Sequence, residues 1–201
     1  KNKVNVGREL LKTHPEINIL ISDDGLQHFN LIRDFEVLVV DQEREFGNRF
    51  LLPAGPLREG LGRINKVDAL VMNGVKTVPN TYKMICYGNK LISCVDSENK
   101  KNLNEYTSKD KVVAITGIGN PDRFFNLLSD TNIVFERVIF NDHHFFSELD
   151  FESYKDTDII MTEKDFVKCK DFAKSNFWYL PINANIDEKL FKKIKDKLRI
   201  N

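Results

Sequence analysis

The chain has 201 residues, with 30 Lys or Arg and 30 Asp or Glu, so its formal net charge is +0. This balance argues against a nucleic-acid partner recognised through bulk positive charge. The hydrophobic fraction of 41%, with 15 Phe, excludes a wholly disordered chain and suffices for one sizeable domain or two small ones.

Cysteine usage and the lack of long apolar runs indicate the cellular setting. Cys86, Cys94 and Cys169 have no C-x-x-C spacing, which favours a reducing, cytosolic environment. No apolar run approaches the roughly 18 residues of a membrane span, and no signal peptide is visible, so we expect a soluble chain. Because the first residue is Lys and the sequence opens on what reads as the end of a helix, we expect a fragment of a longer protein.

Short apolar runs alternate with helical patterns along the chain. A helix over 7–13 is followed by expected strands at 17–22, 35–41 and 69–73. These runs are continuously apolar, which is typical of strands covered on both faces of a parallel sheet. The alternation returns later, with strands expected at 112–116, 133–140, 158–161 and 177–180, and helices expected after Asn120, Ser147, Thr162 and Asp187. The sequence therefore predicts an α/β fold with three-layer α/β/α architecture and a mostly parallel sheet.

The stretch between the two halves changes in character. Strand-like runs flank Gly88 and Asn89, which predicts a β-hairpin, and a polar loop follows. We therefore expect a core domain, a hairpin linker with its loop, and a smaller C-terminal α/β domain, over residues 1–78, 79–110 and 111–201. The alternative is that the hairpin is only the edge of one continuous sheet.

Two adjacent carboxylates, Asp23 and Asp24, directly follow the expected strand at 17–22. Ligands of open α/β sheets bind at the carboxyl ends of strands. Neighbouring carboxylates repel each other unless a cation or hydrogen-bond donors offset them, so a bound Mg²⁺ would explain the pair. The alternative is a polar loop in which Asp24 and Gly25 simply make a turn.

Two further loops follow expected strands. The stretch 117–120, "GIGN", offers backbone N–H groups to an anion at the start of a helix, or is only a tight turn capped by Asn120. It has no Lys at the position that a phosphate-binding G-x-x-x-x-G-K-[ST] loop requires, and that motif is absent from the sequence. In "NDHHFF", His143 or His144 suits a base, a metal ligand or a phosphate contact, with Asp142 to orient the ring, or else a structural role.

Six motifs occur in a fixed order over nearly the whole chain. They are "DDGLQH" (23–28), "VVDQEREFGNRFLLPAGPLREG" (39–60), "VMNG" (71–74), "GIGNPDRFF" (117–125), "DHH" (142–144) and "MTEKDFVKC" (161–169). Each is weak alone, but together they resemble the tetraacyldisaccharide 4'-kinase family, the lipid A 4'-kinases of Gram-negative bacteria.

The resemblance implies a P-loop kinase, incomplete here, with two α/β/α domains joined by a two-stranded β linker. Such a kinase acts peripherally at the cytoplasmic face of the inner membrane. It uses ATP and Mg²⁺ to phosphorylate the 4'-hydroxyl of a tetraacyldisaccharide 1-phosphate, which gives lipid IVA in lipid A biosynthesis. Carried over by motif, the site residues are Asp23 and Asp24 for the metal, Asp24 and His143 for catalysis, and Arg58, Glu59, Gln27 and His28 for phosphate or substrate. In isolation, Arg58 also fits a surface salt bridge.

The departure from the family concerns the phosphate-binding loop. In the family this loop precedes "DDGLQH", and it is not in the given sequence; nor is the acidic partner expected for His143. Because phosphoryl transfer depends on the groups that cradle the phosphates, we expect this chain alone to be inactive and the full-length protein to be active.

A lipid substrate requires an apolar surface next to basic residues. Phe46, Phe50, Leu51 and Leu52 lie near Arg44 and Arg49 in the sequence, which suits an anionic membrane surface, although the two leucines also suit a core. The C-terminal helix carries lysines at 189, 192, 193, 195 and 197, which suit either a membrane surface or a solvated face.

Two other functions fit parts of the sequence. "DHH" after a strand resembles the DHH phosphoesterases, metal-dependent enzymes in which Asp and His bind Mn²⁺ pairs. A non-catalytic α/β binding module is the third possibility, and it predicts no divalent-metal site at Asp23 and Asp24. For the kinase we expect a monomer.

Overall fold

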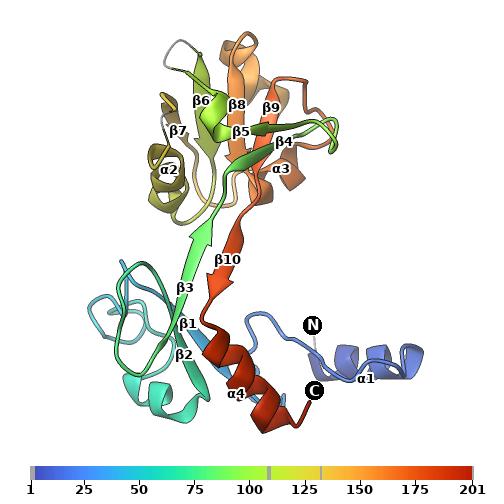
Figure 1. Ribbon diagram of the computed structural model, residues 1–201, viewed down its shortest axis with the longest axis vertical. Coiled ribbons are helices and arrows are strands. Elements are labelled where there is room, and N and C mark those ends of the chain that lie inside the picture. The colour runs from blue at the N-terminus through green and yellow to red at the C-terminus, as the bar shows by residue number, and fades with distance from the viewer. Residues whose placement is uncertain (1–2, 108–109, 132, 201) are drawn as a thin grey trace. The chain divides into compact units, whose positions relative to one another are not determined.

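The computed structural model describes residues 3–107, 110–131 and 133–200, and these form two compact units. Unit 1 contains the described residues up to Ile85 and from Ile186 on. Unit 2 contains those from Cys86 to Asn185, so the chain passes from one unit to the other twice (Figure 1). None of the helices in these ranges has the length and apolar character that crossing a membrane requires.

A four-stranded sheet has the order β1-β2-β3-β10, and unit 1 contains β1, β2, the first part of β3 and the last residue of β10. In it, β1 (Val37–Asp41), β2 (Ala69–Asn73) and β3 (Tyr82–Tyr87) are parallel, and β10 (Asn183–Ile186) lies beside β3. The amphipathic helix α4 (Glu188–Leu198) packs on this sheet, because its Leu190 joins an apolar cluster with Ala69 and Val71. The unit also contains α1 (Lys3–Thr13) and the 3₁₀ helix η1 (Leu61–Lys66).

Unit 2 is built on a six-stranded sheet with the order β5-β4-β9-β8-β6-β7. Four of its strands are parallel: β6 (Val112–Thr116), β7 (Glu136–Ile139), β8 (Asp158–Thr162) and β9 (Phe177–Leu180). The strand β4 (Lys90–Ser93) is antiparallel to both of its neighbours, β9 and β5 (Lys100–Asn102). Its helices are α2 (Pro121–Ser129), α3 (Glu163–Cys169) and the 3₁₀ helices η2 (Leu103–Glu105) and η3 (Glu148–Tyr154).

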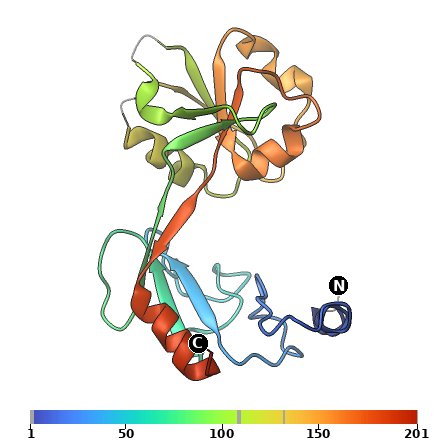
Figure 2. The same ribbon diagram turned by 45° about the vertical axis from the view of Figure 1, so that its right-hand side comes forward.

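Both faces of the unit 2 sheet are covered. Along β6, Val112 and Ala114 join one apolar cluster, whereas Val113 and Ile115 join another, so the two clusters lie on opposite faces. The first cluster includes Phe125 of α2 and the second includes Cys169 of α3, and Figure 2 shows these helices on either side of the sheet. The predicted α/β class with mostly parallel sheets is therefore confirmed. The strands are continuously apolar because both faces of the sheet are covered, as the sequence suggested.

Two predicted elements differ from the structure. The run at 17–22 forms no strand pairing with any described residue, and Ile21 is 94% exposed. The strands that flank Gly88 and Asn89 do not form a hairpin, because β3 pairs with β2 and β10, whereas β4 pairs with β5 and β9. The linker segments of this chain are therefore distant in sequence, at the two crossings between the units.

The compact units also divide the chain differently from the expected parts. The C-terminal helix was assigned to the last part, 111–201, but α4 belongs to unit 1. The reason is its apolar face, since Leu190 is 4% exposed and packs with Val71. The expected helix after Ser147 is the 3₁₀ helix η3, which begins with a capping box between Ser147 and Asp150.

Candidate active site

The loop 23–28, "DDGLQH", lies in unit 1 and begins with a tight turn. Asp24 has φ +50°, in the left-handed region that Asp tolerates better than most residues. The amine of Lys3 in α1 donates to the backbone carbonyls of Asp23 and Asp24, the latter at 3.3 Å, and to the hydroxyl of Ser22 at 3.3 Å. Neither carboxylate has a partner among residues 3–107, 110–131 and 133–200, and both residues are exposed.

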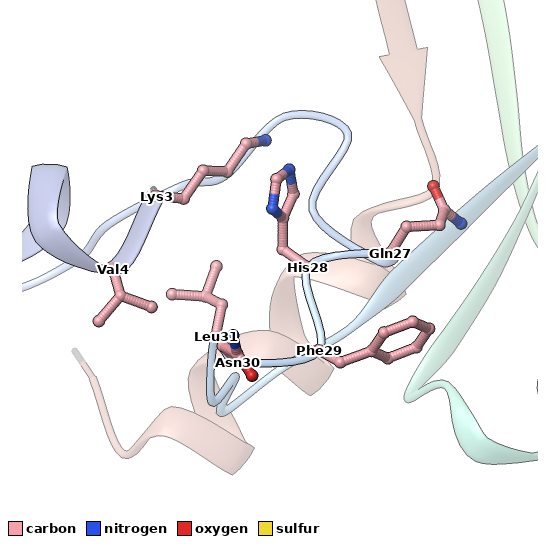
Figure 3. Close-up of a pocket in the computed structure, with 7 residues that line it drawn as sticks. All are labelled: Lys3, Val4, Gln27, His28, Phe29, Asn30 and Leu31. Carbon is pink, nitrogen blue, oxygen red and sulfur yellow. The ribbon is translucent and has the colours of Figure 1, made fainter. Parts of the chain in front are cut away.

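A cavity of about 270 Å³ lies between the start of α1 and the residues that end this loop. Its lining is Lys3, Val4 and residues 27–31. Figure 3 shows the side chains of Lys3 and His28 next to each other, whereas Phe29 points away from them. His28 is exposed, so its ring is accessible at this cavity.

The structure brings two of the predicted binding segments together. The amide of Gln27 donates to Oε1 of Glu59 at 3.2 Å, although 32 residues separate them. The other carboxylate oxygen of Glu59 lies 3.4 Å from Nε of Arg63 in η1. Arg58 is exposed beside this contact. The contact between Gln27 and Glu59 therefore links two segments, and these segments carry four of the predicted residues: Gln27, His28, Arg58 and Glu59.

Sequence reasoning did not single out the residues that connect these segments. Glu36, which precedes β1, accepts from Nε of Arg33 at 2.5 Å and from Nη2 of Arg63 at 2.7 Å. Burial by itself would raise the pKa of Glu36, but hydrogen bonds and charge from Arg63 and Arg33 outweigh it and hold the pKa below the ordinary value. No sequence motif marks this trio, because its members are spaced irregularly and meet only in the fold.

In unit 2, His143 lies on the loop 141–146 that follows β7. Its φ of +63° is in the left-handed region, and its side chain is 77% exposed. Asp142 Oδ1 accepts from the backbone N–H of His143 at 3.0 Å, and its Oδ2 lies 3.7 Å from the ring Nε2. Lys164, in the first turn of α3, lies 4.0 Å from the same carboxylate. The ring of His143 is thus presented to solvent next to one acid.

His144 is held in the fold instead. Its ring stacks on Phe140 at 4.4 Å and meets the edge of Phe146 at 4.9 Å, and its Nε2 lies 3.4 Å from Asp150. Burial opposes ionisation of Asp150, but hydrogen bonds from Ser147 and His144 prevail and lower its pKa. Of the two histidines, His143 is thus the exposed one, whereas the ring of His144 is held by its neighbours.

The loop 117–120 is fixed by a buried carboxylate. Asp165 of α3 is 0% exposed, and its Oδ2 accepts from Thr116 at 2.8 Å and from the backbone N–H of Gly117 at 3.2 Å. Lys168 donates to Oδ1 of Asp165 at 3.0 Å. A Cβ on Gly119 would lie 3.1 Å from Asp142 Oδ2, so the loop passes close to the loop that carries His143. One motif, "MTEKDFVKC", therefore has a structural role here.

The predicted lipid-contact residues are largely exposed. Phe50, Leu51 and Leu52 are 64%, 50% and 61% exposed, so the leucines are not core residues. In α4, Lys193 donates to the backbone carbonyl of Asp68 at 2.6 Å, and Lys197 donates to its carboxylate. Part of the lysine-rich face is therefore used within unit 1.

The predicted site residues are distributed over both units. Asp23, Asp24 and the linked segments with Gln27 and Glu59 belong to unit 1, and His143 belongs to unit 2. Within the described ranges, no group of three or more His, Cys, Asp or Glu side chains is arranged to hold a metal ion.

Comparisons with known proteins agree with one another. The family model for LpxK, tetraacyldisaccharide-1-P 4'-kinase, matches residues 1–199. A tetraacyldisaccharide 4'-kinase from Methylobacillus flagellatus is 46% identical over 198 residues, which cover 98% of this chain and 59% of that protein. Another from Shewanella sediminis is 46% identical over 202 residues, which cover 99% of this chain and 58% of that protein.

One solved structure is also similar. It is the "apo" form of LpxK from Aquifex aeolicus in complex with ATP, with a TM-score of 0.73 and 26% sequence identity. The match covers 98% of this chain and 62% of that chain. This chain thus spans about three fifths of the length of the relatives it matches.

Proposed function

Because the chain belongs to the tetraacyldisaccharide-1-phosphate 4'-kinase family, we propose that its protein transfers the γ-phosphoryl group of ATP to the 4'-hydroxyl of a tetraacylated disaccharide 1-phosphate. The product is lipid IVA, an intermediate of lipid A biosynthesis. The observation that carries the proposal is the contact between Gln27 and Glu59, because it joins two motifs to which the family resemblance assigns binding of phosphate or substrate. Arg58 and His28 flank this contact and supply a guanidinium and an imidazole for phosphate oxygens.

Asp23 and Asp24 are the proposed Mg²⁺ ligands. The two residues are exposed and adjacent in sequence, and their carboxylates have no partner among the described residues, so the hard oxygen donors that Mg²⁺ prefers are accessible. Two carboxylates are enough for this ion, which keeps water and substrate phosphate as its other ligands. When bound, Mg²⁺ would neutralise charge on the phosphates of ATP. Of the two aspartates, Asp24 is also proposed to contribute to catalysis.

His143 is the proposed catalytic histidine. In the transfer, the 4'-oxygen forms a bond to the γ-phosphorus, the bond from that phosphorus to the bridging oxygen breaks, and ADP leaves. The proton of the 4'-hydroxyl passes to the imidazole of His143, which acts as general base. Its exposed ring and its position 3.7 Å from Asp142 support this role.

The protein is proposed to act as a monomer at the cytoplasmic face of the inner membrane, without a nucleic-acid partner. The exposed side chains of Phe50, Leu51 and Leu52, close in sequence to Arg49, support contact with an anionic membrane surface. The lipid substrate resides in such a surface, so this segment would approach it there.

A radiolabel-transfer assay tests the function. The full-length gene product is incubated with γ-³²P-ATP, Mg²⁺ and the tetraacylated disaccharide 1-phosphate in mixed micelles, and labelled lipid is separated by thin-layer chromatography. We expect label in the lipid with the wild type, and about 10²- to 10⁴-fold less with His143→Ala. The 201-residue chain alone should give none, because no G-x-x-x-x-G-K-[ST] sequence lies within it.

The same protein distinguishes the other functions. Hydrolysis of a phosphodiester with Mn²⁺, without phosphoryl transfer, would favour a DHH-type phosphoesterase. Neither activity from a folded wild type would favour a binding module and would overturn the kinase proposal.

A further inference from the structure

A carboxylate with two guanidinium partners lies behind the predicted binding segments of unit 1. Glu36 accepts from Arg33 on Oε1 at 2.5 Å and from Arg63 on Oε2 at 2.7 Å. The Glu36 side chain is 13% exposed and each arginine is 18% exposed, so water screens these pairs little. Charge-assisted hydrogen bonds of this kind are among the strongest polar contacts in proteins.

Besides Glu36, each arginine contacts a different segment of unit 1. Nη1 of Arg33 donates to the backbone carbonyls of Gly25 at 3.1 Å and His28 at 3.0 Å, which lie within loop 23–28. Nε of Arg63 lies 3.4 Å from Glu59, which in turn accepts from Gln27 at 3.2 Å. The contacts therefore form a closed ring through the loop and back to Glu36.

The ring is anchored to the sheet. The backbone N–H of Glu36 donates to Oδ2 of Asp68 at 2.9 Å, and the carbonyl of Glu36 accepts from the backbone N–H of Ala69 at 3.1 Å. Glu36 is thus fixed at the point where β1 and β2 begin to pair. The loop itself contains no helix or strand, so these polar contacts, more than secondary structure, determine where it lies.

We propose that Arg33, Glu36 and Arg63 are positioning residues that hold loop 23–28 and Glu59 in one fixed arrangement, an inference that rests on the proposed kinase function. None of the three is assigned a contact with substrate. They act through Gln27, Glu59 and the backbone of the loop that carries Asp23 and Asp24. A misplacement of about 1 Å at such a site lowers the rate by roughly 100-fold.

The experiment compares variants of the full-length gene product at a temperature well below their unfolding transitions. Arg33→Lys and Arg63→Lys keep the positive charge, but a lysine cannot make the forked contacts of either guanidinium. Glu36→Gln removes the shared acceptor charge. Val71→Ala in β2 is the matched control, because Val71 is 1% exposed and its truncation loosens unit 1 without touching the ring.

Two readouts are measured on each variant: kcat and KM for the kinase reaction, and deuterium uptake of the peptide containing residues 23–28. The proposal expects about 10- to 100-fold lower kcat/KM and faster uptake in this peptide for the three ring variants. Val71→Ala should lower the melting temperature and leave kcat/KM within about twofold. Arg63→Lys combined with Glu59→Gln should lose little more than the larger single loss, because both residues act through one chain of contacts.

The outcomes separate this inference from the proposed function. Two results with an active wild type would overturn the positioning role alone. In the first, kcat/KM of the ring variants stays within twofold of the wild type. In the second, the ring variants lose activity only in proportion to their melting temperature, as Val71→Ala does. A folded wild type without 4'-kinase activity would overturn the proposed function and the catalytic consequence drawn from it. Unchanged deuterium uptake at 23–28 in all three ring variants would overturn the positioning role whether or not the enzyme is active.

Discussion

The two compact units are stabilised by different means. Unit 2 buries large apolar side chains on both faces of its sheet, among them Phe125, Leu128 and Phe177 at 0%, 0% and 2% exposure. In unit 1, the buried hydrophobic residues among those described are Val40, Ala69, Val71, Met72 and Leu190. Its large side chains at 21, 29 and 32 are 94%, 73% and 92% exposed.

Both units contain ion pairs, but in unit 1 they connect loops that have few buried apolar side chains, whereas in unit 2 they accompany extensive packing. The ring around Glu36 and the pairing of Asp68 with Lys197 connect its loops to its sheet. Packing contributes stability that depends on shape, whereas ion pairs contribute stability that depends on pH. The proposed metal, phosphate and substrate residues therefore lie in the unit with fewer buried apolar side chains.

The largest expected effect tests the packing of unit 2. Phe125→Ala removes a fully buried ring from α2, and we expect it to lower the free energy of unfolding by about 3–5 kcal/mol, because the cavity cannot be filled by its neighbours. Trp178 is the single tryptophan and belongs to unit 2, so its fluorescence in a urea titration reports this unit. Phe145→Ala is the control in the same unit; Phe145 is 93% exposed, and its removal should change stability by no more than about 0.5 kcal/mol. A loss below about 1 kcal/mol for Phe125→Ala would contradict a tightly packed unit 2.

A smaller effect is expected from the buried polar group of unit 2. Asp165→Asn removes the charge that Lys168 pairs with, and a neutral amide matches the surrounding donors less well. We expect a loss of about 2–4 kcal/mol, measured by the same fluorescence titration. Glu152→Gln breaks the pair with Lys155, whose side chains are 59% and 61% exposed, and should have almost no effect. Equal losses for the two variants would remove the distinction between buried and surface pairs.

The sequence was most informative where packing dictates structure. The apolar runs that became β2, β6 and β9 were predicted within a residue, because strands covered on both faces must be continuously apolar. The run at 17–22 has the same character but finds no strand to pair with among the described residues, and local pattern does not reveal that. The hairpin at Gly88 and Asn89 was wrong for a related reason, since the partners of β3 and β4 come from distant segments.

For the candidate site, motifs indicated residues but not their supports. Gln27 and Glu59 were identified from separate motifs, and only the fold places them 3.2 Å apart. None of the six motifs contains Arg33, Glu36 or Arg63. A ring of salt bridges has no fixed spacing of its residues along the sequence, so no motif marks it. His144 illustrates the opposite case, because a repeated His suggested chemistry and the second ring proved to be stacked on Phe140.

The smallest expected effect is the acid sensitivity of unit 1. The pKa of Glu36 in the folded protein lies below its ordinary value of 4.5, because hydrogen bonds and charge from Arg63 and Arg33 outweigh the effect of burial. A carboxyl with a lowered folded pKa contributes stability that is complete above its unfolded pKa and is lost as the pH falls through the folded pKa. We therefore expect protection of the β1 and β2 amides to fall as the pH drops below about 4.5.

Hydrogen–deuterium exchange of these peptides, corrected for the intrinsic rate at each pH, measures that loss. The loss should be smaller than the effects above, because a protonated carboxyl still accepts from one guanidinium. Glu36→Gln should weaken protection at neutral pH and flatten its dependence on acid, whereas Val71→Ala should lower protection at every pH and keep the slope of the wild type. Since Asp68 also has a lowered pKa, part of the slope should remain in Glu36→Gln. A slope in that variant as steep as in the wild type would mean that Glu36 does not set the charge dependence of unit 1, and that the contrast with unit 2 rests on packing alone.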